Sequence, residues 1–285
     1  MRVEDGFTPL FAEADRAAVR AQRRYLRLTL TGLVVAVIAA IGSAISADTR
    51  IGGQSVDLGG VVSGVAFLTG AGLGLFVLIA KPERNWYENR AVAESIKTLC
   101  WQYVAGAFAR PADVLEAEIR DIVHPMSHSG LLVTEGNEEV TSSMREIRAR
   151  PADERRRLYL AQRIDDQNRY YARQALLNRK LATRWFAAAI GHQAVGAVLA
   201  VLKAIDVVDA DLLGIVATAA AGALAWIQTR DCQNLAESYR VTANELAEIR
   251  AEAQAVDADG WSAFVRGAEQ AISREHTLWR ARRVT

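Results

Sequence analysis

A histidine and a glutamine interrupt an otherwise apolar and uncharged stretch of the sequence. His192 and Gln193 lie about seven residues into the stretch 185–202. Imidazole titrates near neutral pH, and an ionisable side chain inside a membrane is a candidate for function. Two roles are open for His192: it lines a water-filled path, or it hydrogen-bonds a neighbouring helix, as polar groups in membrane bundles often do.

The other residues with metal-binding or nucleophilic side chains do not combine into a site. His124 and His128 have a spacing that suits a metal on a helix, but the proline and glycine near them predict a loop. Cys100 and Cys232 are far apart in the sequence and are expected to be reduced thiols. There is no glycine-rich phosphate loop and no nucleophile motif. We expect no metal, no cofactor and no enzymatic activity.

Acidic side chains gather in the two loops that connect the apolar stretches. They are Asp48, Asp57, Asp206, Asp209 and Asp211. In an oligomer these carboxylates would concentrate cations at the outer mouth of a path. Solvated loop charge is the simpler explanation.

The polar residues His192 and Gln193 lie in one of four stretches that contain no charged residue, and the acidic loops connect these stretches in pairs. The four stretches cover residues 28–47, 58–80, 185–202 and 212–229. A helix of about 20 apolar residues crosses a bilayer core of about 30 Å, so each stretch is predicted to be a transmembrane helix. The last two are shorter, and for them a buried helix of a soluble bundle is the alternative.

The distribution of basic residues predicts how these spans are oriented. Arginine and lysine are concentrated before the first and third spans and after the second and fourth, while the connecting loops hold only Arg50 and Lys203. By the positive-inside rule both hairpins enter from and return to the cytoplasm, so both termini are cytosolic. The net charge of +1 gives no general attraction to nucleic acid. The content of 51% hydrophobic against 24% charged residues excludes a disordered chain.

Periodicity and helix-breaking residues predict the elements outside the spans. An amphipathic helix is expected near 8–24, helices follow the spans at 83–109 and 230–254, and the last helix covers 261–280. No segment shows convincing strand alternation.

One long helix is predicted to lead into the third span. Residues 141–143 are expected to open a short helix before it, and Ser143 with Glu146 indicates a capping box there. Pro151 is expected to begin a helix that continues into the span without a break.

The two halves of the sequence share one order of features: basic helix, span, short acidic loop, span and long helix. We predict a first two-span domain at 1–125, a linker at 126–140 and a second two-span domain at 141–285. Because both hairpins have the same orientation, the duplication would be parallel. The expected fold is an all-α membrane protein, with four transmembrane helices as two hairpins and long cytosolic helices that form a bundle.

Small residues line one face of two spans, where they permit close helix approach in lipid. The fourth span carries Gly214, Thr218 and Gly222, and the second carries Gly60, Gly64, Gly70 and Gly74. These faces serve packing within a hairpin or association between subunits.

Arginines and aromatic residues are frequent in the predicted cytosolic helices. The arginines are Arg155, Arg156, Arg157, Arg163 and Arg169. They suit an anionic ligand, but a solvated helix or anionic lipid headgroups explain them as well.

A resemblance to a known family emerges from these helices. The run 141–185 resembles the SLATT family of two-span effector domains, through Arg155, Tyr159, Arg163, Asp166, Gln167, Tyr170, Tyr171, Asn178 and Trp185. The closing helix is similar through Phe264, Glu269, Glu275 and Trp279. The segment after the second span is similar through Trp86, Tyr87, Arg90, Glu94 and Lys97, and Trp101 lies on the same helical face as the last four of these. Together these segments span nearly the whole chain as two tandem domains.

The resemblance implies a bacterial membrane effector that forms oligomers in conflict or antiphage systems. We expect an inner-membrane channel or pore-forming protein that is gated by a nucleotide messenger, or by a nucleotide-sensing or nucleotide-synthesising partner acting in trans. The expected partners are the lipid bilayer and further copies of the chain, and not nucleic acid. The alternative is a non-conducting membrane scaffold or adaptor that presents its cytosolic helices to a partner protein.

Overall fold

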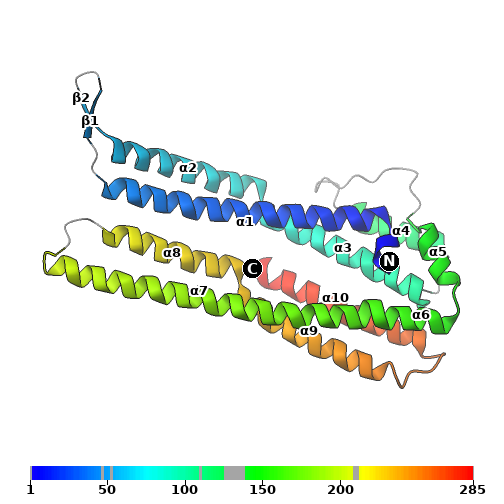
Figure 1. The fold of residues 1–285 in the computed structure, drawn as a ribbon. Coiled ribbons are helices and arrows are strands. Elements are labelled where there is room, and N and C mark those ends of the chain that lie inside the picture. Colours follow the sequence, from blue (N-terminus) through cyan, green and yellow to red (C-terminus); the bar gives the residue numbers. More distant parts are fainter. Residues whose placement is uncertain are drawn as a thin grey trace. The chain divides into compact units, whose positions relative to one another are not determined.

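The structure is a computed structural model that describes residues 2–45, 48–51, 54–108, 111–124, 139–207 and 212–284. For Ile51 and residues 274–284 it describes the backbone. Helices dominate the fold (Figure 1). The all-α prediction is therefore confirmed.

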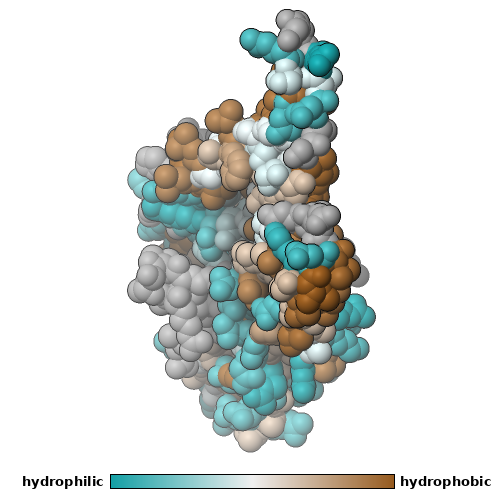
Figure 2. All heavy atoms as spheres, turned by 90° about the vertical axis from the view of Figure 1, so that its left-hand side faces the viewer, coloured by the Kyte–Doolittle hydropathy of each residue, from teal (hydrophilic) through white to brown (hydrophobic). Residues whose placement is uncertain are grey.

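Within the described residues, four helices are long and apolar enough to cross a membrane by length and composition. They are α1 (Pro9–Ala44), α2 (Leu58–Ala80), α7 (Asp166–Ala204) and α8 (Leu212–Arg230). The predicted amphipathic helix and first span are one continuous helix, α1. The predicted spans 58–80, 185–202 and 212–229 fall within α2, α7 and α8. Hydrophobic residues are exposed on the face of the molecule that Figure 2 shows.

The remaining elements are shorter or more polar. They are the 3-10 helix η1 (Val3–Gly6), strands β1 (Asp48–Ile51) and β2 (Gln54–Asp57), helices α3 (Pro82–Ala105), α4 (Ala112–Val123), α5 (Ser142–Ala149) and α6 (Ala152–Tyr159), the π-helix η3 (Leu160–Asp165), and helices α9 (Cys232–Glu252) and α10 (Trp261–Val284). Most of the predicted linker lies outside the described residues, so the division of the chain at 126–140 stays a prediction.

Contacts divide the chain into two compact units, and each collects segments from both halves of the sequence. Unit 1 consists of residues 1–22, 83–175 and 237–285, and unit 2 of residues 23–82 and 176–236. Helices α1, α7 and α9 contribute residues to both units.

Unit 1 has a hydrophobic core that its helices share. Ile96 of α3, Leu115 and Ile119 of α4, Ile164 of η3 and Val265 of α10 are fully buried in it. The spacing of Leu115 and Ile119 places both on one face of α4, which is strongly amphipathic. Burying such side chains contributes roughly 1.5–3 kcal/mol each, so this core holds the unit together.

In unit 2, α1 and α2 pack closely where small residues meet (Figure 1). A Cβ atom added to Gly42 would lie 2.9 Å from the Gly59 carbonyl oxygen, and one added to Gly59 would overlap the Ile45 carbonyl oxygen. The Ser63 hydroxyl donates to the Ala39 carbonyl at 3.0 Å. Close backbone approach and a buried hydrogen bond are the usual means of helix association in lipid.

A two-stranded hairpin connects α1 to α2, so the expectation of no strand was wrong here. Strands β1 and β2 pair antiparallel, with Asp48 opposite Asp57 and Ile51 opposite Gln54. Each strand has four residues, which is too few for alternation to be recognised. The Gly-Gly pair between them is a typical sequence for a two-residue hairpin connection.

The start of α5 also differs from the prediction. Thr141 caps the helix, because its hydroxyl oxygen accepts a hydrogen bond from the Met144 amide at 3.2 Å. The same hydroxyl donates to the Gly6 carbonyl at 2.5 Å. The capping box predicted for Ser143 and Glu146 was therefore wrong, although Thr141 lies in the stretch 141–143 that was expected to open the helix.

The long helix toward the third span begins as predicted, since Pro151 is the N-cap of α6. It is not regular throughout, because residues 160–165 form the π-helix η3 before α7 continues. Such segments insert one extra residue into a helix and are frequent at functional sites.

Candidate functional site

A buried ion pair links η3 to α10 in unit 1. Arg163 Nε and Nη2 donate to Glu269 Oε1 and Oε2 at 2.9 and 2.7 Å, and both side chains are essentially fully buried. The Tyr159 hydroxyl donates to Glu269 Oε1 at 3.0 Å. Burial lowers the pKa of the Arg163 guanidinium, but attraction to Glu269 outweighs burial and the pKa is raised overall. Three hydrogen bonds satisfy this carboxylate, so the cluster is a structural connection between two elements.

A row of aromatic rings surrounds this ion pair. The Tyr159 ring lies edge-on to Trp101 and Trp261, with centroid distances of 5.9 and 5.7 Å, and Phe7 lies 5.4 Å from Trp101. Each such pair contributes about 0.5–1.5 kcal/mol beyond the area that it buries. Burial raises the pKa of Tyr159 well above its usual value, and Glu269 raises it further.

The predicted polar face of α3 is buried and paired. Lys97 Nζ and Trp101 Nε1 both reach Glu4 Oε1, at 2.9 and 3.1 Å. Arg90 pairs with Glu94 at 2.5 Å and with Asp15 at 3.1 Å. Glu4 precedes the first long helix, and no sequence pattern singled it out as a partner for α3.

Side chains from other elements cap the carboxyl end of α3. Arg148 of α5 donates to the carbonyls of Tyr103 and Phe108 at 3.0 and 3.1 Å. From α10, Trp261 Nε1 donates to the Ala105 carbonyl at 3.1 Å. The last carbonyls of a helix lack partners within it and carry partial negative charge, so they favour such donors.

The other family-pattern residues also serve packing where their side chains are described. Four of them make ring contacts: Trp86 stacks on Tyr87, Phe264 stacks on Trp261, the Tyr171 ring lies beside that of Tyr239, and the Trp185 ring lies 6.3 Å from that of Trp226. Asp166 forms an ion pair with Arg169, and Tyr171 and Asn178 are buried. Gln167 is half-buried and Tyr170 is exposed. The side chains of Glu275 and Trp279 lie outside the described residues. Most of the described pattern residues therefore serve contacts within the fold.

The arginines considered for an anionic ligand do not form one common surface. Arg155 Nε donates to the Arg150 carbonyl at 3.2 Å, and Arg156 lies over the Trp261 ring at 4.9 Å. Arg163 is buried and Arg169 pairs with Asp166, which leaves Arg157 exposed on its own. Four of these five guanidinium groups therefore serve contacts within the chain.

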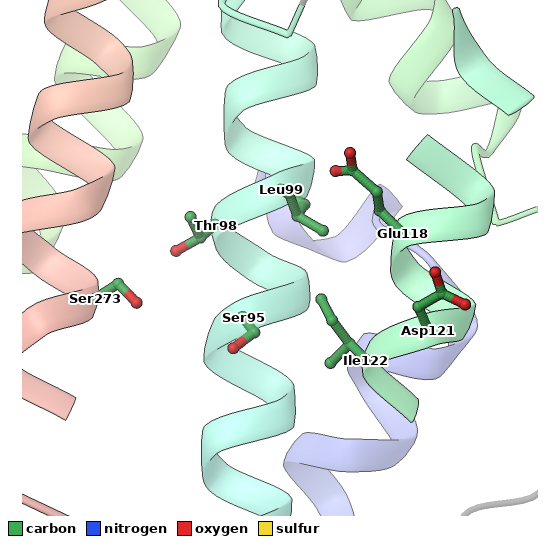
Figure 3. Close-up of a pocket in the computed structure, with 7 residues that line it drawn as sticks. All are labelled: Ser95, Thr98, Leu99, Glu118, Asp121, Ile122 and Ser273. Carbon is green, nitrogen blue, oxygen red and sulfur yellow. The ribbon is translucent and has the colours of Figure 1, made fainter. Parts of the chain in front are cut away.

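Unit 1 contains an open groove of about 370 Å³ between α3, α4 and α10 (Figure 3). Its described lining combines hydroxyls, carboxylates and two apolar side chains: Ser95, Thr98, Leu99, Glu118, Asp121, Ile122 and Ser273. None of these carries a positive charge. Phosphate recognition relies on cationic or backbone N–H donors, so this groove does not suit a nucleotide.

His192 and Gln193 are both exposed on the surface of α7. The hydrogen bond that the structure shows for His192 is with the Ala188 carbonyl of the same helix, at 2.7 Å. The imidazole therefore does not bridge two helices of this chain. Thr218 similarly donates to the Gly214 carbonyl at 2.8 Å, within α8.

The predicted small-residue faces are only partly used within the chain. Added Cβ atoms at Gly70 and Gly222 would lie 3.9 Å from Val35 and 4.0 Å from Leu33 of α1. At Gly64 and Gly74 nothing lies within 4 Å. The closest approach of α2 to α1 is at Gly59 and Ser63, one residue before the predicted pair of Gly60 and Gly64. Small residues at a spacing of four occur in both registers, so spacing alone did not select the correct one.

Three of the five acidic loop residues, Asp48, Asp57 and Asp206, lie within the described part of the chain. Asp57 caps α2 by accepting a hydrogen bond from the Gly59 amide at 3.0 Å, and it lies opposite Asp48 in the hairpin. Asp206 has a left-handed backbone with φ of 52°. Asp209 and Asp211 lie outside the described residues, as does His128, while His124 caps the end of α4.

Two family models match the chain in tandem. The model for SMODS and SLOG-associating 2TM effector domain 3 matches residues 8–156, and the model for domain 1 of the same series matches residues 159–279. No curated protein and no solved structure matches the chain.

Proposed function

Since this chain belongs to the SMODS and SLOG-associating 2TM effector (SLATT) family, we propose that it is an oligomeric channel or pore-forming effector of the bacterial inner membrane. The family and the four spanning-length helices fit a membrane effector. The finer assignment concerns what the effector does in the bilayer. It gives the chain no catalytic step.

The exposed polar surface of α7 is the observation that carries this proposal. His192 and Gln193 lie in the apolar stretch with their side chains outside any contact to another helix that the structure shows. Placing polar groups against lipid hydrocarbon is unfavourable, so such groups usually face a bundle interior or a water-filled cavity. A neighbouring subunit or an aqueous path would provide that environment.

The open glycine faces support association between copies. Gly64, Gly72 and Gly74 of α2 and Gly191 of α7 have no neighbour within 4 Å of an added Cβ. Small residues at lipid-facing positions permit close approach of a further helix. Gly222 is less suited to this role, because it faces Leu33 of the same chain.

Gating would act through helices that are shared by the two units. Helices α1 and α7 run from unit 1 into unit 2 without interruption, so a rearrangement of unit 1 changes the spans directly. A signal shifts such an equilibrium only if it binds one state better than the other. We propose that a nucleotide messenger, or a sensor partner in trans, supplies this difference.

Conductance of the purified full chain in planar bilayers tests the proposal. We expect discrete currents that depend on a member of a panel of cyclic nucleotides or on an added partner protein. Silence under every condition, with oligomers verified in the same lipid, would contradict a channel and favour a non-conducting scaffold. Protease protection in inverted inner-membrane vesicles tests the expected cytoplasmic termini.

A further inference from the structure

A basic hollow lies on α7 beside the start of its apolar stretch. Arg179, Lys180 and Arg184 line it together with Leu176, Thr183 and Ala187, and its volume is about 540 Å³. All three cations are exposed. Across the described part of the chain, no carboxylate pairs with any of them. The Thr183 hydroxyl donates to the Arg179 carbonyl at 3.1 Å, so the donors available to a ligand are the guanidinium and ammonium groups.

The same helical face becomes apolar along the span. Positions 176, 180, 183, 187, 190, 194, 198 and 201 recur at intervals of three and four, which places them on one side of α7. On this side Ile190, Val198 and Val201 are 66%, 59% and 62% exposed. His192 and Gln193 lie on another side of the helix, since they fall outside this periodicity. The basic hollow therefore continues into an exposed apolar stripe.

We propose that this face of α7 binds an anionic phospholipid. The phosphodiester lies among Arg179, Lys180 and Arg184, and an acyl chain follows Ile190, Val198 and Val201. Basic side chains next to a span are attracted to anionic lipid, by roughly fivefold in affinity for each cation near the surface. The apolar stripe favours a lipid over a free phosphate compound, because only a lipid covers both parts. The inference rests on α7 crossing the membrane and not on conduction.

Lipid retention by the full-length protein tests this site. The chain is purified in detergent, incubated with equimolar phosphatidylglycerol and phosphatidylcholine, and the retained lipid is counted by native mass spectrometry. We expect phosphatidylglycerol to be preferred. The triple variant Arg179→Gln, Lys180→Gln, Arg184→Gln should weaken that binding at least tenfold.

A charge-matched variant separates this site from general charge. Arg2→Gln, Arg120→Gln and Arg157→Gln remove three exposed cations of unit 1 and should leave the preference unchanged. A variant that keeps the charges, Arg179→Lys with Arg184→Lys, should retain most of the binding, and an unchanged thermal unfolding temperature of the first triple variant shows that its loss of binding is not misfolding. Equal loss in both triple variants would overturn the proposal.

The deacylated headgroup, glycerophosphoglycerol, identifies the source of the phosphate. If a lipid is the ligand, millimolar glycerophosphoglycerol leaves the retained phosphatidylglycerol unchanged. Displacement at concentrations similar to those of the lipid would make this an ordinary site for soluble phosphates and would overturn the lipid assignment. Lipid retention is measured without any conductance measurement. The lipid site can therefore be disproved while the proposed channel stands, and the channel can be disproved while the lipid site stands.

Discussion

At the scale of single residues, the ion pair of Arg163 and Glu269 sets the geometry of unit 1. Buried pairs of this kind gain little net stability over apolar side chains, but losing one partner leaves a buried charge without compensation. The pair also fixes which residues of η3 face α10, since Tyr159 bonds to the same carboxylate. Loss of one partner is therefore expected to cost more than replacement of both by apolar side chains.

Glu269→Gln should destabilise unit 1 strongly. The neutral amide leaves the Arg163 guanidinium buried without its counter-ion, at a cost of about 3–5 kcal/mol. Thermal unfolding of the full chain in detergent should show the loss. The double variant Arg163→Met, Glu269→Leu should recover a large part of it. Arg240→Gln removes an exposed pair with Glu237 and should change stability by less than about 1 kcal/mol. If Glu269→Gln behaved like Arg240→Gln, the pair would not be buried in solution.

Cys100 should be unreactive in the folded protein. Burial raises the pKa of its thiol to about 12, so the thiolate fraction at neutral pH is roughly 10³-fold below that of an ordinary cysteine. In a Cys232→Ser background, N-ethylmaleimide should label the denatured chain rapidly and the native chain at least 100-fold more slowly. Equal rates would show that α3 is not buried at this position.

The raised pKa of Cys100 also makes the free energy of unfolding depend on pH under alkaline conditions. A folded pKa above the unfolded value means that the folded state holds the thiol proton more tightly. The contribution is present below the unfolded pKa of about 8.5 and is lost as pH rises from there toward 12. Cys100→Ala should reduce this alkaline decline in thermal unfolding, whereas Cys232→Ala serves as the comparison.

At the scale of elements, the contact of α1 with α2 depends on backbone approach. Gly59→Ala should lower the unfolding temperature, since the new Cβ would overlap the Ile45 carbonyl and force the helices apart, at about 1–3 kcal/mol. Gly32→Ala in α1 is the control, because nothing lies within 4 Å of its added Cβ and the residue is not on a face proposed for association. Equal effects of both substitutions would mean that α2 meets α1 through a different face.

The junctions that follow the second and fourth spans share an unusual backbone. Lys81 after α2 and Asp231 after α8 both adopt the left-handed conformation, with φ of 41° and 46°. Non-glycine residues rarely occupy this region, so each junction is a fixed bend that begins α3 or α9. The same bend at corresponding places is consistent with a parallel duplication.

At the scale of the whole molecule, His192 separates a conducting path from ordinary packing. If it lines a path, His192→Ala should change single-channel conductance or its dependence on pH between 5 and 8, where imidazole titrates, while native gels show unchanged assembly. Gln193→Ala reports on the adjacent position. Currents that stay identical over this pH range would remove His192 from the path and leave it facing a subunit contact.

The sequence by itself determined the four spans, because a stretch of about 20 uncharged apolar residues has few stable locations outside lipid. The aromatic and arginine pattern of residues such as Tyr159 and Arg163 also sufficed to indicate the family. Helix starts were predictable from local signals, as at Pro151 and within 141–143. The choice of Thr141 over Ser143 as the capping residue was not predicted, and in the structure the Thr141 hydroxyl also donates to the distant Gly6 carbonyl.

The partners of the polar residues were decided only by the tertiary structure. Glu269 is 106 residues from Arg163, and Glu4 is 97 residues from Trp101, so no periodicity connects them. The choice of Gly59 over Gly60 depends on the rotation of α2 against α1, which sequence spacing leaves open. Each compact unit contains segments from both halves of the sequence. This arrangement likewise depends on long-range packing, since side chains bury their apolar area against whichever surface the fold brings to them.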